Sequence, residues 1–336
     1  MIKIAQIGAG HDHAEAVAQT LALQSDIYDF VGYAVVDGDE AVYEKNRHKY
    51  KGIRQITVDE ILNIPGLDAA CIETDDRNLT KYALIAAQRG LHIHMDKPGS
   101  VSDEDFDRLI DTVKDKKAVF HTGYMYRYNP AVIKLKEDIA SGRLGRIYSV
   151  DAQMNCNLPP QKRRLLGSYP GGMLYYLGCH LIDLVYSICG MPQEIIPLST
   201  SVEDDSDGAN DFAAAIFKYR GGISSVKSTA VEIGGFERRQ LVVCGTKGTV
   251  EIKPLEWQTF AHDDIFTAQT TFVREAFDAD WHKKGSCHET DVFGRYDAMM
   301  RAFADYVNGK KNNSFGYEYE RQLHKLILRA CGKEID

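Results

Sequence analysis

The first third of the chain alternates short apolar runs with segments of helical periodicity. Residues 2–8 form an apolar run, and further along Ala14, Val17, Ala18 and Leu21 follow the spacing of one helical face. The alternation continues with strands predicted at 30–37, 67–74, 91–95 and 118–124 and helices at 58–64, 78–90 and 102–117. Strands that alternate with helices predict right-handed βαβ units and a doubly wound parallel sheet of the Rossmann type.

The alternation stops near residue 125, and extended segments dominate the remainder. After a helix around 130–140, strands are predicted at 147–156, 194–202, 210–220, 222–234, 237–245 and 248–255. The stretches YRGGIS and CGTKGTVEI resemble hairpin turns, and a closing helix is predicted over about 318–331. We therefore predict an α/β fold with two domains, a Rossmann domain over 1–124 and an α+β domain with a largely antiparallel sheet over 125–336.

Composition and charge narrow the class of protein. The 336 residues are 44% hydrophobic and 26% charged, as in an ordinary globular protein of about two domains. The net charge of −8 gives no basic surface, so we expect no nucleic-acid partner. The seven cysteines include no CxxC pair and the histidines no HExxH motif, so we expect reduced thiols and no metal. We find no signal peptide and no apolar run of about 18 residues, so we expect a cytoplasmic protein outside the membrane.

A glycine turn closes the first predicted strand. In IGAGHDH, Gly8 allows a tight turn, and Gly10 lets a pyrophosphate approach the amides at the helix N-terminus. The third glycine of the dinucleotide fingerprint is replaced by His13, and Asp12 adds a negative charge. The alternative is a glycine turn that only starts a helix.

An acidic residue at the end of the second strand favours NAD as the cofactor. Asp37 would accept the ribose hydroxyls and repel a 2′-phosphate, so NADP is the less favoured cofactor. We also assign His11 and Thr74 to the cofactor site. The alternative for Asp37 is an ordinary turn residue before Gly38.

Lys97 precedes a proline at the end of another predicted strand. In HMDKPGS, Pro98 disfavours helix at Lys97, and the carboxyl end of a parallel strand faces the ligand crevice in this architecture. Such an ammonium would contact the nicotinamide ribose and a substrate hydroxyl. An exposed loop lysine is the alternative.

A polar stripe follows PGG in the stretch YYLGCHLIDL. On a helix, Tyr176, His180 and Asp183 share one face, because residues separated by four and seven positions stack. Asp183 would orient His180, and Tyr176 would assist or bind substrate. The alternative is the solvated face of an ordinary helix.

The motifs IGAGHDH, MDKPGS, GYMYRYNP, PGGMLYYLGCHLIDL and VVCGTKGTVEI together resemble the Gfo/Idh/MocA family, the glucose–fructose oxidoreductase and inositol dehydrogenase group. The resemblance covers nearly the whole chain. It implies a nucleotide-binding domain and a second domain that binds substrate and often forms a dimer or tetramer. It also implies that Lys97 and His180 are the catalytic lysine and histidine. Three departures stand out: Asp96 replaces glutamate, Asp75 replaces proline, and Tyr176 replaces the usual aspartate.

Substrate contacts are expected at Arg127 and at the end of the strand VDAQMNCN. Arg127 either tethers the domain junction, which we favour, or faces the substrate, and Asn155 and Asn157 match positions where the family often places substrate ligands. The resulting hypothesis is NAD-dependent oxidation of a secondary alcohol in a sugar-like or polyol substrate. One alternative is a ligand-sensing or regulatory protein without catalysis, because Tyr176 replaces the aspartate. Another is NAD-assisted glycoside cleavage.

Overall fold

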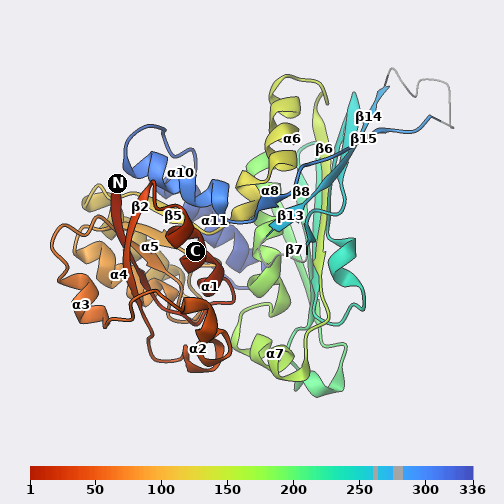
Figure 1. The fold of residues 1–336 in the computed structure, drawn as a ribbon. Helices are drawn as coiled ribbons and strands as arrows, with labels where there is room; N and C mark the ends of the chain where they lie inside the picture. The colour runs from red at the N-terminus through yellow and green to blue at the C-terminus, as the bar shows by residue number, and fades with distance from the viewer. Residues whose placement is uncertain (260–263, 275–282, 336) are drawn as a thin grey trace. The chain divides into compact units, whose positions relative to one another are not determined.

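The computed structural model describes residues 1–259, 264–274 and 283–335 (Figure 1). The chain divides into two compact units. The first contains Met1–Met125 and Tyr296–His324, and the second contains Tyr126–Arg295 and Lys325–Asp336. Among the described helices, none is long and apolar enough to cross a bilayer.

The first unit is built on a five-stranded parallel sheet with the order β2-β1-β3-β4-β5. Its strands are β1 (Ile2–Ile7), β2 (Tyr28–Ala34), β3 (Ala69–Ile72), β4 (His92–Met95) and β5 (Phe120–Thr122). The predicted Rossmann-type sheet is therefore confirmed. Chain order reverses between β1 and β3, and ligands of open α/β sheets bind at the carboxyl ends of the strands beside such a reversal.

The helices of this unit begin and end largely where capping residues and apolar faces predict. They are α1 (Ala14–Leu23), α2 (Glu40–Asn46), α3 (Val58–Leu62), α4 (Leu79–Gln88) and α5 (Asp103–Asp115), with a 3₁₀ turn at Arg47–Tyr50. Ser102 caps α5 by accepting a hydrogen bond from the Asp105 amide at 3.2 Å. The predicted apolar face of α5 is buried, and it consists of Phe106, Leu109, Ile110 and Val113.

A late segment of the chain belongs to the first unit, contrary to the predicted boundary of 1–124. The segment contains α10 (Asp297–Val307) and the start of α11 (Tyr317–Ala330). The Tyr28 hydroxyl donates to the Met300 carbonyl at 2.5 Å, and the Tyr317 hydroxyl donates to the Ala118 carbonyl at 2.6 Å. Hydrophobic periodicity predicts that a helix has a buried face, but it does not say which sheet covers it.

The second unit is built on an eight-stranded sheet with the order β15-β14-β11-β10-β6-β9-β8-β7. Its strands are β6 (Ile147–Asn155), β7 (Glu194–Thr200), β8 (Phe212–Tyr219), β9 (Gly222–Thr229), β10 (Gln240–Gly245), β11 (Gly248–Ile252), β14 (Ala268–Val273) and β15 (Ser286–Glu289). β6 pairs with β9 in parallel and the other neighbours are antiparallel, which confirms the largely antiparallel sheet. A smaller sheet joins β12 (Trp257–Gln258), β13 (Asp264–Phe266) and β16 (Phe293–Gly294).

The helices of the second unit include one irregular turn that the sequence did not predict. They are α6 (Pro130–Ala140), α7 (Pro160–Leu165) and α8 (Cys179–Cys189), preceded by 3₁₀ turns at Met125–Tyr128 and Leu166–Ser168. Leu174–Gly178 form a π-helical turn directly before α8. A π turn holds more residues than an α turn, so Tyr176 is not in register with His180 on a regular α-helical stripe.

Candidate functional site

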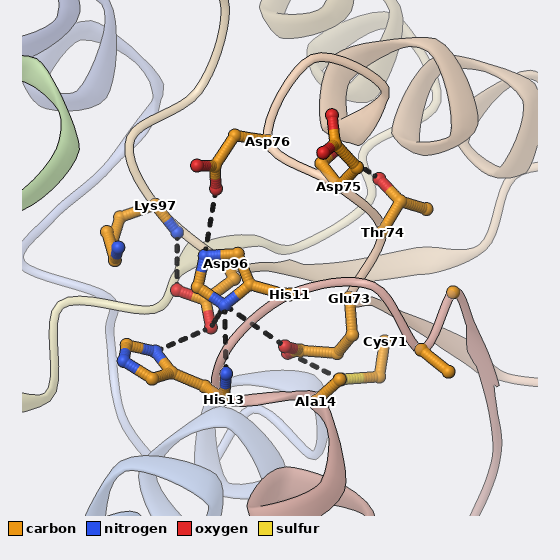
Figure 2. Close-up of polar contacts among 12 residues, drawn as sticks. His11, His13, Ala14, Cys71, Glu73, Thr74, Asp75, Asp76, Asp96 and Lys97 are labelled. Carbon is orange, nitrogen blue, oxygen red and sulfur yellow. Dashed lines mark hydrogen bonds and ion pairs between the residues drawn. The ribbon is translucent and has the colours of Figure 1, made fainter. Parts of the chain in front are cut away.

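Ionisable side chains gather at the carboxyl ends of three parallel strands in the first unit. His11 and His13 follow β1, Glu73 and Asp76 follow β3, and Asp96 follows β4. Figure 2 shows His11, His13, Glu73 and Asp96 pointing toward one another. We call these five residues the histidine–carboxylate cluster.

Asp96 and His11 are the centre of this cluster. The Asp96 Oδ2 atom lies 3.0 Å from His11 Nδ1 and 2.9 Å from His13 Nδ1. On its other side, His11 Nε2 lies 3.0 Å from Asp76 Oδ1. His11 and Asp96 are only 3% and 1% exposed, and Glu73 is fully buried, so water does not screen these contacts.

Burial and mutual charge shift the titration of the cluster. Although burial disfavours its charge, His11 and His13 hold the pKa of Asp96 well below its ordinary range. Burial and the neighbouring Asp96 raise the pKa of Glu73 well above its ordinary value. Burial opposes the charge of His11, but Asp96 and Asp76 outweigh it and raise the pKa of His11 to about 10. The cluster therefore favours a cation beside Asp96.

A second layer of buried polar groups supports Glu73. The Cys71 thiol donates to Glu73 Oε1 at 3.4 Å, and His94 Nε2 lies 3.7 Å from the same oxygen. His94 Nδ1 in turn lies 2.7 Å from His121 Nδ1. Burial lowers the pKa of His94 to about 4, so this ring is neutral near pH 7. His94 is therefore a core histidine whose ring contacts other buried polar groups.

Lys97 lies next to the cluster, just beyond β4. Its backbone amide donates to Asp96 Oδ1 at 2.6 Å, and the residue is 3% exposed. In Figure 2 its side chain extends away from the Asp96 carboxylate. Lys97 is therefore a buried lysine at the carboxyl edge of the sheet, which excludes the alternative of an exposed loop lysine.

The two glycines of the turn after β1 are required by close packing. A Cβ atom on Gly8, which has a φ of +101°, would lie 2.4 Å from the Thr74 amide nitrogen. A Cβ on Gly10 would lie 2.1 Å from Asp39 Oδ1 and 2.8 Å from the Asp75 amide nitrogen. Both glycines therefore allow the turn to contact the segment that follows β3.

The amides of this turn are bonded within the chain. The Ala9 amide donates to Asp39 Oδ2 at 2.7 Å, and the amides of Gly10 and His11 donate to the Glu73 carbonyl at 3.1 and 3.0 Å. These are amides of the kind that hold a dinucleotide pyrophosphate at the start of such a helix. A pyrophosphate that bound these amides would therefore have to replace contacts with Asp39 and with the Glu73 carbonyl.

Asp37 and Thr74, the two residues predicted for the ribose end of a dinucleotide, have different environments. Asp37 is exposed just beyond β2, and its backbone carbonyl accepts a hydrogen bond from Asn78 Nδ2 at 3.1 Å. Thr74 is buried, and its hydroxyl donates to the Asp75 carbonyl at 2.9 Å. Binding of a nucleoside by the Asp37 carboxylate stays a prediction, whereas Thr74 supports the loop.

In the second unit, His180 is a buried residue at the start of α8. Its ring packs edge-on against Tyr126, with the centroids 5.3 Å apart and the planes at 82°. Tyr176 is half-buried in the π turn and stacks on Tyr169, with the centroids 6.1 Å apart. The burial of His180 argues against the interpretation of this stripe as a solvated helix face.

Asp183 contacts Arg127, a partner that the sequence interpretation did not predict. The guanidinium donates three hydrogen bonds to the carboxylate, from Nε at 3.1 and 3.0 Å and from Nη2 at 2.8 Å. Both side chains are almost fully buried. This contact gives Arg127 a structural role, and the orientation of His180 by Asp183 stays a prediction.

The two predicted asparagines have different environments. Asn155 is buried, and its Nδ2 donates to Glu232 Oε2 at 2.7 Å. Asn157 is exposed beyond β6 and pairs with Val231 through a backbone bridge. Substrate binding by either residue stays a prediction.

Sequence reasoning missed most of the histidine–carboxylate cluster. His13 and Asp96 were noted only as departures from family motifs, and Glu73 and Asp76 were not singled out. One signal was available, because each lies at the carboxyl end of a predicted parallel strand or within six residues after it, where side chains from several strands meet. Asp39 was missed because it lies two residues beyond the expected ribose-binding position.

Comparisons with known proteins agree with both units. Residues 2–124 match the profile described as "Oxidoreductase family, NAD-binding Rossmann fold", and residues 132–251 match "GFO/IDH/MocA C-terminal domain". The chain is 24% identical to myo-inositol 2-dehydrogenase of Thermotoga maritima over 67% of this chain and 68% of that protein. It is also 24% identical to D-xylose 1-dehydrogenase (NADP(+)) 2 of Haloferax volcanii, over 63% of this chain and 65% of that protein.

A solved structure shows the same fold along almost the whole chain. Levoglucosan dehydrogenase in complex with NADH and L-sorbose superimposes with a TM-score of 0.76 at 19% identity, covering 99% of this chain and 97% of that one. The parallel Rossmann sheet, the large second sheet and the two profile matches lead to one conclusion. This chain belongs to the Gfo/Idh/MocA family of oxidoreductases, whose first domain is an NAD-binding Rossmann fold.

Proposed function

We propose that this protein is a dehydrogenase that transfers hydride between a secondary alcohol of a sugar-like or polyol substrate and NAD. The names of the relatives support the substrate class, because they act on an inositol, a pentose and an anhydrosugar. The observation that carries the proposal is a buried lysine at the carboxyl edge of the parallel sheet of an NAD-binding family, Lys97.

The nicotinamide supplies the hydride acceptor when the cofactor is bound, and the protein supplies binding and proton transfer. In this proposal Asp37 accepts the ribose hydroxyls, and its charge disfavours a 2′-phosphate. Lys97 supplies a positive charge that stabilises the developing alkoxide. His180 removes the hydroxyl proton, and Tyr176 assists it or binds the substrate.

The experiment is a panel of polyols, aldoses and uronic acids assayed with NAD and NADP by the absorbance of the reduced nicotinamide. With a substrate identified, Lys97→Met is expected to lower kcat by a factor of about 100 or more, the scale of a lost acid–base element. The melting temperature should stay close to that of the parent protein. Lys114→Met, at an exposed position on α5, is the matched control and should leave kcat unchanged.

The roles of the histidine and the tyrosine are tested separately. His180→Asn should abolish most of the activity, and Tyr176→Phe shows whether the phenol has a chemical role. If both variants and Lys97→Met turn over at the parent rate, the assignment of the acid–base residues is wrong.

A ligand-sensing protein without catalysis is the second candidate. Two observations favour it: Tyr176 replaces the family's usual aspartate, and the Asp39 carboxylate holds the Ala9 amide. A protein of this kind would bind a sugar-like ligand but reduce no NAD with any member of the panel. Calorimetry with the same compounds distinguishes ligand binding without turnover from the absence of binding.

A further inference from the structure

Three side chains of the histidine–carboxylate cluster bring metal-binding atoms to one point. His11 Nδ1 and His13 Nδ1 lie 3.0 and 2.9 Å from Asp96 Oδ2, and the three atoms all lie within 4.8 Å of one another. In a tetrahedral site with bonds of about 2.0–2.2 Å, neighbouring ligand atoms are roughly 3.4 Å apart. A small outward movement of these atoms therefore makes room for an ion.

The contact of His11 with Asp76 orients its ring so that Nδ1 faces that point. Asp76 Oδ1 lies 3.0 Å from Nε2, where it accepts the ring N–H. The His13 backbone amide lies 3.2 Å from Nδ1, and an ion bound at Nδ1 would replace this hydrogen bond. A carboxylate on the far nitrogen is the usual outer partner of a metal-binding histidine. A cation on Nδ1, either a proton or a metal ion, accounts for the 3.0 Å separation between Nδ1 and Asp96 Oδ2.

Glu73 offers a fourth ligand on the other side of His11. Its carboxylate is fully buried, and Oε2 lies 4.0 Å from His11 Nδ1 without a hydrogen-bond donor. A divalent ion would take this oxygen as a ligand and would place positive charge beside the buried carboxyl groups.

We propose that His11, His13, Asp96 and Glu73 bind one divalent transition-metal ion, with Asp76 as the outer partner that orients His11. Two imidazoles with carboxylates form a donor set that suits zinc, and zinc is the probe we choose. The His13 side chain is 15% exposed and provides the route by which an ion enters. This site is contrary to the expectation of no metal, which rested on the absence of local motifs. Its ligands come from three separate loops.

The test uses the full-length protein, purified without chelator, and measures its metal content by mass spectrometry. We expect close to one equivalent of a divalent metal per chain. After treatment with EDTA and dialysis, Zn²⁺ should bind with a stoichiometry of one by calorimetry and raise the melting temperature. Neither measurement needs a substrate or NAD, so each outcome is independent of the proposed dehydrogenase activity.

Variants locate the ion. Loss of an outer partner costs about 10–100-fold in metal affinity, so loss of a ligand in His13→Asn or Asp96→Asn should weaken Zn²⁺ binding by more than about 100-fold. His48→Asn, an exposed histidine of the same unit, is the matched control and should bind Zn²⁺ like the parent. Circular dichroism of each variant checks that it is folded.

Two results would overturn the proposal. The first is a parent protein that contains no metal as purified and gives no heat of Zn²⁺ binding after EDTA treatment, in which case a proton on His11 is the cation. The second is parent-like Zn²⁺ affinity in a folded His13→Asn variant, which would place the ion elsewhere. A metal-binding protein that turns over no substrate would instead contradict the proposed function alone.

Discussion

Asp37 and Asp39 are two positions apart, yet their environments differ completely. Asp37 is exposed just beyond β2, whereas Asp39 is fully buried and binds the amides of Ala9, Val36 and Asp75 at 2.7, 3.1 and 3.1 Å. Burial raises the pKa of Asp39, although these three amides oppose the shift. At this scale, sequence position alone does not separate a ligand-binding acid from a structural one.

The first prediction concerns the exposed acid. If Asp37 binds the ribose hydroxyls, the parent protein should bind NAD at least ten times more tightly than NADP, a difference of about 1.4 kcal/mol. Asp37→Ala should reduce this preference, and Glu44→Ala, an exposed acid on α2, should leave it unchanged. Calorimetry measures both affinities, and equal affinities in the parent would contradict the assignment.

The second prediction concerns His92, a half-buried residue at the start of β4. Its Nδ1 accepts a hydrogen bond from the Val119 amide at 2.9 Å, and burial lowers its pKa. A lowered pKa in the folded state means that the unfolded chain binds the proton more readily than the folded chain does. His92 therefore contributes to the free energy of unfolding at pH values above the ordinary histidine pKa. This contribution is lost as the pH falls below that value.

Denaturant titrations between pH 5 and 8 measure this effect. The free energy of unfolding of the parent should fall toward the acid end, and in His92→Gln that fall should be smaller. The exposed His48→Gln is the control and should show the slope of the parent. An unchanged slope in His92→Gln would mean that other groups carry the pH dependence.

At the scale of elements, a buried ion pair joins the 3₁₀ turn that contains Arg127 to α8. The guanidinium binds both Asp183 oxygens, so removal of Arg127 leaves a carboxylate that is 1% exposed without its main partner. Loss of one member of a buried pair typically costs about 3–5 kcal/mol. This contact positions the helix that begins with the candidate catalytic histidine.

The third prediction follows from that contact. Arg127→Met should lower the free energy of unfolding by about 3–5 kcal/mol in a denaturant titration. Arg143→Met removes a half-exposed pairing with Asp138 on α6, and it should cost at most about 1 kcal/mol. If Arg127→Met lowers the free energy of unfolding no more than Arg143→Met does, the pair of Arg127 and Asp183 contributes little to stability. A substrate-binding role for Arg127 then gains support.

At the scale of the whole molecule, the first unit is assembled from two segments that are far apart in the sequence. Phe303 of α10 lies against His121 and His94 of the parallel sheet, with ring centroids 5.4 and 5.8 Å apart. Gln24 Nε2 donates to the Asp297 carbonyl at 3.0 Å, and Asn313 Nδ2 donates to the Phe120 carbonyl at 3.1 Å. The late segment is therefore part of the core of the first unit.

The fourth prediction tests this assembly. Phe303→Ala should destabilise the protein by about 3–5 kcal/mol, as expected for an aromatic side chain removed from a core. Ile233→Ala, at a position that is 88% exposed, should have little effect. Unfolding of the full chain in denaturant measures both, and a Phe303→Ala variant as stable as the parent would show that the first unit does not depend on α10.

Local patterns in the sequence predicted much of the fold. The period of apolar residues identified the strands of the parallel sheet and most of the helices, and Ser102 correctly marked the start of α5. These features depend on residues that are close together in the sequence, within about one helical turn or one strand. They can therefore be predicted from the sequence alone. The strand predicted at 30–37 lies at Tyr28–Ala34, because strand ends depend on the pairing partner as well as on local pattern.

The family motifs also led from sequence to Lys97 and His180, but the tertiary structure alone decided which side chains meet. His11, Glu73 and Asp96 are separated by more than 20 residues from one another, and they come together because the parallel sheet aligns the carboxyl ends of β1, β3 and β4. The pairing of Asp183 with Arg127 and the docking of α10 are likewise contacts between distant segments. The period of apolar residues along an element determines which of its faces is buried. Only the folded chain determines which residues that face contacts, and which partners a nearby charged side chain meets.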